Sequence, residues 1–353
     1  FIIFITLFAL IHFALGHLSI VGTIAIILTY INLVYICLIM RIEFLSTYIR
    51  VMRLLCIVAL IIWGIIVINP NVHAIILSFK DFVPQFISQT WLENSSNPCT
   101  SLYIYYLSSD IPESFPLFRN CGPFYEPGLF ASYIVIALTL NYTHTKKIFN
   151  ISNIIFLLTL LTTMSSAGYV SMVFVLLYFA LSSKKTYIKV TLFLAILLLW
   201  EPIYNLEFMA EKIESNMMAG EDDASSRFGA IAYHAEKVAV SPFVGYMGGK
   251  MPNTSLDIFM GHALDEQIIS PNGLSYVFVY WGIPLAVLFY IFLYKGLHLM
   301  VANNCKKWEA VIIYIIVLSA AFSQTITIQP IILTIAVYAI TNNKHLIIND
   351  KQS

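Results

Sequence analysis

One short stretch combines residue types that can bind an anion and move a proton. Residues 119–133 read RNCGPFYEPGLFASY and place Arg119 and Glu126 close together, at the start of an apolar segment. A guanidinium group can hold a phosphate with two parallel hydrogen bonds, and a carboxylate can accept a proton. Simpler roles stay open. Arg119 can lie at a membrane interface or pair with Glu126, and Glu126 can merely precede a helix that Pro127 begins.

A second stretch, SSRFGAIAYHAEKVAVSPFVGYMGG at 225–249, predicts an amphipathic helix. Ser225 or Ser226 is the expected N-cap, and Pro242 with Gly245 is the expected end. This helix would carry a second arginine, Arg227, on a rigid element. The alternative is a helix that lies along the lipid headgroups.

Three further polar residues accompany the second arginine. On a 3.6-residue period, His234 shares a helix face with Arg227, Ile231 and Val238. His262 precedes Asn272 at the entrance to the next apolar segment, and a neutral histidine there is a candidate base. Either histidine can instead be an ordinary structural or surface residue. The acidic run 221–223 is better explained as a solvated loop than as a metal site, so we expect no metal and no cofactor.

The composition indicates a membrane protein. Of 353 residues, 59% are hydrophobic and 11% are charged, against roughly 25% charged in an ordinary soluble domain. The net charge is zero and no basic patch suggests nucleic acid. The chain begins at Phe1 inside an apolar run, so we expect that further sequence precedes it.

The apolar runs predict an all-α, polytopic protein with about ten transmembrane helices in a single multi-span domain, 1–353. Lysines and arginines concentrate in the short connections 41–53, 144–150, 183–189 and 295–307, which is typical of cytoplasmic loops. Two long loops, 70–127 and 201–272, would then face the periplasm. The expected spans are 1–15, 18–40, 54–69, 128–143, 153–182, 188–200, 273–294, 309–325 and 328–342.

The segment 153–182 has basic residues at both ends, so one span would place one of these groups outside. We therefore predict a hairpin of two short helices with its turn at 165–168. One long tilted helix is the alternative. Cys99 and Cys121 both fall in the first long loop, where a disulfide between them is a hypothesis for an oxidising periplasm.

The stretch at 119–133 resembles the R-x-x-G-x-F-x-E-P-G-x-x-A motif of the O-antigen polymerase and ligase family, particularly the Wzy-type polysaccharide polymerases. The match includes Arg119, Gly122, Glu126, Pro127 and Gly128. The later P-F-x-G-Y turn, and the S-P-N-G-L element followed by W-G-I, are similar to that family's second outer loop and next span. Ala167 stands where this family often has an arginine.

The resemblance implies a multi-pass glycosyltransferase of the bacterial inner membrane. Its partners would be undecaprenyl-pyrophosphate-linked glycans, the lipid bilayer and a chain-length regulator protein. Arg119 and Arg227 would bind the pyrophosphate, while His262 or Glu126 would act as the base. Supporting roles would fall to Gly122, Pro127, Gly128, His234, Gly245 and Asn272.

Other functions fit parts of the same pattern. An O-antigen ligase would use the same donor but transfer the finished chain to lipid A core. A metal-dependent glycosyltransferase would use the acidic run 221–223. A lipid-linked oligosaccharide flippase would be expected to carry charged residues inside its spans, whereas the apolar runs here contain almost none.

Overall fold

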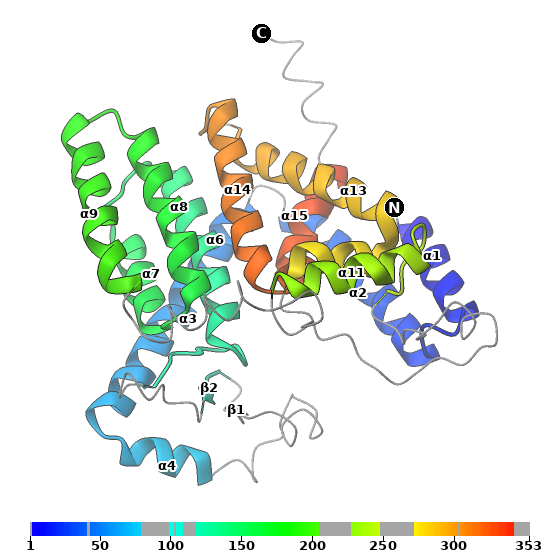
Figure 1. The fold of residues 1–353 in the computed structure, drawn as a ribbon, viewed down its shortest axis with the longest axis horizontal. Coiled ribbons are helices and arrows are strands. Elements are labelled where there is room, and N and C mark those ends of the chain that lie inside the picture. The colour runs from blue at the N-terminus through cyan, green and yellow to red at the C-terminus, as the bar shows by residue number, and fades with distance from the viewer. Residues whose placement is uncertain are drawn as a thin grey trace. The chain divides into compact units, whose positions relative to one another are not determined.

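The computed structural model describes residues 2–40, 43–78, 99–101, 104–108, 118–204, 227–247, 272–302 and 304–341. Within these ranges the chain is almost wholly helical (Figure 1), which confirms the all-α expectation. Two short antiparallel strands lie in the first long loop, β1 (Cys99–Ser101) and β2 (Tyr106–Ser108). Thr100 pairs with Leu107 between them.

The chain forms two compact units. The first contains α1 (Ile2–Ala14), α2 (Ile20–Met40), α11 (Gly229–Val240), α13 (Gly273–Val301), most of α14 (Lys307–Ser323), η2 (Ile326–Ile328) and α15 (Pro330–Thr341). The second contains most of α3 (Glu43–Ile68), α4 (Asn71–Ser78), both strands, α6 (Pro127–Thr145), α7 (Ile151–Thr162), α8 (Ser166–Ser182), α9 (Thr186–Tyr204) and residues 315–320 of α14.

Three of the described helices, α2, α3 and α13, are long and apolar enough to cross a membrane, judged by length and composition. The helices α1, α7, α8 and α15 are also apolar but have only 10–17 residues. Large apolar side chains face outward, for example Ile3 on α1, Val21 on α2 and Leu54 on α3. Water would solvate such surfaces poorly, so both features are compatible with a membrane protein.

Helix α3 begins earlier than the sequence analysis predicted. Residues 41–53 were expected to connect two spans, but α3 already starts at Glu43 and includes Arg50 and Arg53. Arginine is a good helix former, and the segment EFLSTYIRVMR contains neither proline nor glycine to stop the helix. Arg53 also donates a hydrogen bond of 3.3 Å to Ser152 Oγ, at the start of α7.

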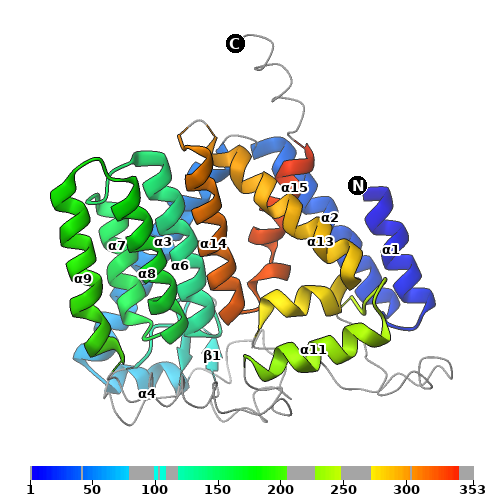
Figure 2. The same cartoon turned by 45° about the horizontal axis from the view of Figure 1, so that its top comes forward.

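The predicted break within 153–182 is confirmed, but the turn lies at 163–165 rather than at 165–168, since residues 166–168 already belong to α8. Helix α7 ends at Thr162 and α8 begins at Ser166, so two short helices replace one long span. Ser165 caps α8 by accepting a hydrogen bond from the backbone N–H of Gly168, and Met164 in the turn has a φ of 47°. Figure 2 shows the two helices side by side, as the hairpin prediction requires.

Helix α6 lies at the centre of the second unit. It packs against both α7 and α8, and α8 packs in turn against α9 (Figure 2). Its middle is inaccessible on all sides, since Phe130, Ile134 and Val135 have no exposed surface. A helix that is apolar all round belongs in an interior. The first turn of α6 is therefore a rigid base for the residues that precede it.

Candidate functional site

The segment 118–126, which we term the arginine loop, is fastened to the end of α7 by Asn120. This residue is fully buried. Its backbone N–H donates to the carbonyl oxygen of Thr162 at 3.0 Å, and its side-chain amide donates to Thr162 Oγ1 at 2.9 Å. Its side-chain oxygen accepts from the N–H of Gly122 at 3.1 Å. Asn120 therefore fixes its own backbone and that of Gly122, and Arg119 is its immediate neighbour in the chain.

Gly122 bends the arginine loop. Its φ is +52°, and a Cβ atom there would lie 2.5 Å from the ring of Phe130. Its carbonyl oxygen accepts a 2.7 Å hydrogen bond from the N–H of Tyr106 on β2. Beyond the bend, Phe124 packs on the rings of Phe130 and Tyr133. Any side chain at 122 would displace this aromatic packing.

The end of the arginine loop matches the prediction for a helix start. Pro127 is in the first turn of α6, and Glu126 occupies the N-cap position in an extended conformation. The Glu126 side chain makes no capping hydrogen bond to the backbone of α6. Its negative charge still lies at the positive end of the helix dipole, which is a favourable position. Gly128 is buried, and its carbonyl oxygen accepts from Ser132 Oγ at 3.0 Å.

Tyr125, beside Glu126, is not a competing base. Burial, and then the negative charge of Glu126, raise the pKa of Tyr125 to about 12. The phenol therefore keeps its proton near neutral pH. Within the described arginine loop, Glu126 is the group that can accept a proton there.

Arg119 is half-buried and keeps a donor unused. Its Nε atom is buried and has no hydrogen-bond partner among the described residues. Its charge acts on the phenol of Tyr169, near the start of α8. A buried donor without a partner is rare in folded proteins, and arginine stays charged in proteins. Arg119 is thus a half-buried cation with one donor that no described residue satisfies.

Two residues that the sequence analysis did not single out support the other side of Arg119. Trp63 on α3 donates its ring N–H to the carbonyl oxygen of Phe118 at 2.7 Å. His73 on α4 stacks on the Phe118 ring, with 4.0 Å between ring centroids. These partners are distant in sequence from Arg119, and no local pattern marks them.

Cys121 is fully buried and packs with Tyr106 and Tyr125. Cys99 belongs to β1, which pairs with β2 through Ser108. The side chain of Cys99 lies outside the described part of the chain. The disulfide between Cys99 and Cys121 therefore stays a prediction.

The second predicted helix exists, but it begins later than expected. Helix α11 starts at Gly229, with Phe228 in the N-cap position, so the expected cap by Ser225 or Ser226 is wrong. Arg227 precedes the helix rather than sharing one of its faces. Tertiary contacts hold this start: the Phe228 ring packs against Phe322.

Asn272 organises the residues beside Arg227. It is fully buried, and its side-chain oxygen caps α13 by accepting from the N–H groups of Leu274 and Ser275. Its amide nitrogen donates to the carbonyl oxygen of Arg227 at 3.1 Å. One side chain thus joins the start of α13 to the backbone that carries the second arginine.

His234 lies inside the first unit, where it has a structural role. It is 1% exposed, and its Nδ1 shares a 2.7 Å hydrogen bond with Ser275 Oγ. Burial lowers the pKa of His234 to about 4, so the ring is neutral near pH 7 and a weak base. On the predicted face, Val238 packs on Tyr246 and Val279, but Ile231 is exposed.

The end of α11 is as predicted, because the helix stops at Ser241 before Pro242. Residues 242–247, which we term the docking turn, then pack against a kink in α13. The kink is at Gly282, where φ is 73° and ψ is 168°. Pro284 follows and has no N–H to give to the Tyr280 carbonyl.

Backbone groups of the docking turn replace the hydrogen bonds that the kink removes. Tyr246 N–H donates to the Val279 carbonyl oxygen at 2.9 Å, and Met247 N–H donates to that of Tyr280 at 2.7 Å. In return, Ile283 N–H donates to the Pro242 carbonyl oxygen at 2.7 Å. The P-F-x-G-Y and W-G-I patterns are therefore two halves of one contact.

The sequence-predicted site residues divide between the two units. Arg119, Gly122, Glu126, Pro127 and Gly128 belong to the second unit, whereas Arg227, His234, Gly245 and Asn272 belong to the first. His262 and the acidic run 221–223 lie outside the described residues. The candidate site residues thus form two groups, one in each unit, and each group contains one arginine.

No protein-family model, curated protein or solved structure matches this chain.

Proposed function

We propose that this chain is a Wzy-type surface-polysaccharide polymerase, a membrane glycosyltransferase that joins undecaprenyl-pyrophosphate-linked oligosaccharide repeat units. The observation that carries the proposal is Arg119, whose chain neighbour Asn120 is bonded to Thr162 and whose buried Nε has no partner among the described residues. The resemblance of residues 119–133 to the motif of that family supports the same conclusion.

A diphosphate is the anion that this arrangement suits. Its oxygens accept the paired hydrogen bonds that a guanidinium donates, which lysine does not reproduce. Diphosphate is also the leaving group, so a donor that stabilises its growing charge lowers the barrier. Removing one such donor typically costs about 3 to 4 kcal/mol of transition-state stabilisation.

Arg227 is the second diphosphate ligand in this proposal. Its backbone carbonyl accepts a hydrogen bond from Asn272, whereas Arg119 directly precedes Asn120, which is bonded to Thr162. In both cases a buried asparagine lies beside the arginine and is hydrogen-bonded to the end of a helix. Asn120 bonds the last residue of α7, and Asn272 caps the start of α13. This shared construction supports a common role, since a positioned side chain loses less freedom when it binds its ligand.

The reaction needs one proton acceptor. The acceptor sugar hydroxyl attacks C1 of the growing chain, the bond from C1 to the diphosphate oxygen breaks, and the hydroxyl proton passes to a base. His262 and Glu126 are the candidates. The burial of His234 argues against it, and Tyr125 keeps its proton.

In this proposal the chain crosses the bacterial inner membrane about ten times, and loops 70–127 and 201–272 face the periplasm. The three helices of membrane-spanning length and the four shorter apolar helices support multiple crossings. Both arginines then lie near the outer headgroups, where a lipid-linked diphosphate resides.

Deletion of the gene, followed by gel analysis of lipopolysaccharide and lipid-linked glycans, tests the proposal. A polymerase deletion leaves core capped by a single repeat and no ladder, and wild-type protein but not Arg119→Ala restores the ladder. Arg50→Ala is the matched control, because Arg50 is an exposed arginine of α3. Bare core with long chains left on undecaprenyl would indicate a ligase. Single repeats trapped on the inner leaflet would indicate a flippase.

A further inference from the structure

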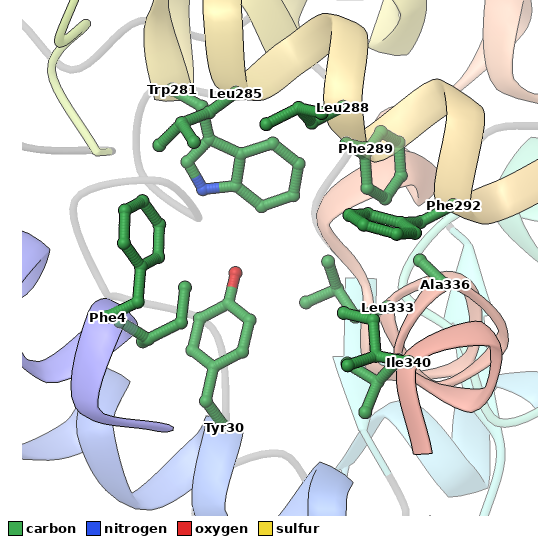
Figure 3. Close-up of a pocket in the computed structure, with 12 residues that line it drawn as sticks. Phe4, Tyr30, Trp281, Leu285, Leu288, Phe289, Phe292, Leu333, Ala336 and Ile340 are labelled. Carbon is green, nitrogen blue, oxygen red and sulfur yellow. The ribbon is translucent and has the colours of Figure 1, made fainter. Parts of the chain in front are cut away.

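The first unit contains an apolar cavity that the proposed reaction does not use. Its volume is about 260 Å³, and its walls come from α1, α2, α13 and α15. Figure 3 shows aromatic and aliphatic side chains around it, among them Phe4, Phe289, Phe292 and Leu333. An apolar cavity of roughly 150 Å³ already takes up benzene rather than water. A space of this size is therefore suited to a piece of hydrocarbon.

The cavity reaches the outer surface of its unit. Phe4 is 48% exposed and Leu288 is 45% exposed, and both line it. The surrounding helices α2 and α13 have the length and composition to cross a membrane. In a bilayer, the molecules that can enter such an opening are lipids, and the part that fits an apolar wall is a hydrocarbon chain.

Two polar groups interrupt the apolar wall. The side chain of Trp281 is 6% exposed, and its buried ring N–H interacts with the hydroxyl group of Tyr30 but makes no hydrogen bond of good geometry among the described residues. The hydroxyl group of Tyr30 points into the same space from α2 (Figure 3). A buried donor without a well-formed hydrogen bond is costly, so an occupant that supplies an acceptor oxygen would satisfy it better than the Tyr30 hydroxyl does.

The chemistry of these groups selects the kind of lipid. None of the lining residues in the described chain carries a charge, so a phosphate group would lose water here without gaining a cation. A neutral carbonyl oxygen has no such penalty and accepts from an N–H and an O–H. An ester-linked acyl chain presents this oxygen at one end of a long apolar segment.

We propose that this cavity binds one acyl chain of an ester-linked membrane phospholipid, with its ester carbonyl oxygen bonded to Trp281 and Tyr30. The chain then runs along Phe289, Phe292 and Leu333. This site is separate from the arginine loop and does not depend on the polymerase proposal. A protein that lacks glycosyltransferase activity would still bind lipid here.

Photocrosslinking tests the site in the full chain, reconstituted in nanodiscs of ether-linked phosphatidylglycerol that contain a trace of ester-linked phosphatidylcholine with a diazirine on its acyl chain. Peptides from α13 and α15 that line the cavity should carry the label. Ala336→Phe, which fills the cavity from α15, should abolish that label. Labelling that spreads over all apolar helices and is unchanged by Ala336→Phe would overturn the proposal.

Competition identifies the ligand. Ester-linked phosphatidylcholine should displace the label about fivefold better than its ether-linked analogue, which lacks the carbonyl oxygen. Trp281→Phe keeps the ring but removes the N–H, so it should erase this preference. Trp308→Phe is the matched control on the exposed side of α14. Equal competition by both lipids, or displacement only by an isoprenyl phosphate, would contradict an acyl ester as the ligand.

Discussion

Asn120 and Thr162 are joined by two hydrogen bonds, one from the Asn120 backbone and one from its side chain, at 3.0 and 2.9 Å. They lie far apart in sequence, and the contact fixes the backbone next to Arg119. The position of the guanidinium group therefore depends on a contact with the end of α7. This dependence can be measured.

Asn120→Ala should destabilise the protein by about 1 to 3 kcal/mol, because it leaves the buried N–H of Gly122 without its acceptor. Thr162→Val keeps the shape and removes one hydroxyl, so its effect should be smaller. Thermal unfolding of the purified protein in detergent measures both. The polymer ladder should shorten in the same order. Wild-type stability and ladder in Asn120→Ala would show that this contact does not position Arg119.

Arg119→Lys should lose most polymer while the protein still folds, since lysine keeps the charge but cannot make two parallel hydrogen bonds. The expected loss is on the order of a hundredfold, which corresponds to one missing transition-state donor. The ladder, normalised to the amount of protein in the membrane, is the measurement. Arg50→Lys should leave the ladder unchanged. A near-normal ladder from Arg119→Lys would remove the paired hydrogen bonds from the mechanism.

Gly245→Ala should destabilise the contact between the docking turn and α13 by more than about 1 kcal/mol, because the glycine has a positive φ. Its φ is +68°, and a Cβ would lie 2.5 Å from the backbone nitrogen of Gly282. Gly64→Ala is the control, since that helical glycine on α3 has open space around it. The unfolding midpoint should fall only for Gly245→Ala. Equal midpoints would mean that the docking turn can move away without cost.

Stability should decrease as the pH falls below about 6.5. His234 has a folded-state pKa of about 4 against 6.5 when unfolded, so the unfolded chain binds more protons between these values. The contribution is fully present above pH 6.5 and is lost progressively toward pH 4. Burial also lowers the pKa of His17, which adds in the same direction.

His234→Gln isolates the share of His234 in this pH dependence. The variant should have a lower unfolding midpoint at pH 7.5, because it alters the hydrogen bond to Ser275. Its midpoint should nevertheless fall less between pH 7 and pH 4.5 than that of the wild type. If the unfolding midpoint fell equally with pH in both proteins, His234 would not stay neutral in the folded protein.

The disulfide hypothesis predicts that Cys99 and Cys121 resist alkylation before reduction. Mass spectrometry of protein alkylated in denaturant without reductant should find both unmodified, and reduction should expose both. Cys56, which lies buried in α3, is the comparison thiol. Alkylation of both residues without reduction would exclude the bond.

Short-range patterns in the sequence predicted several features of the structure. Pro127 begins α6, a break interrupts 153–182, and α11 stops before Pro242, because each depends on backbone chemistry within a few residues. The low charge and the long apolar runs likewise indicated apolar helices. The motif at 119–133 identified Arg119 and Glu126 as candidates for chemistry.

Contacts between distant segments decided the rest. The start of α11 depends on Phe322 and Asn272, and the α13 kink at Gly282 is completed by backbone groups of the docking turn. His234 loses its basicity because folding buries it beside Ser275. The sequence alone determined which residue types were present and where helices stop locally. Only the tertiary structure decided which polar groups find partners, since a hydrogen bond depends on distances that folding sets.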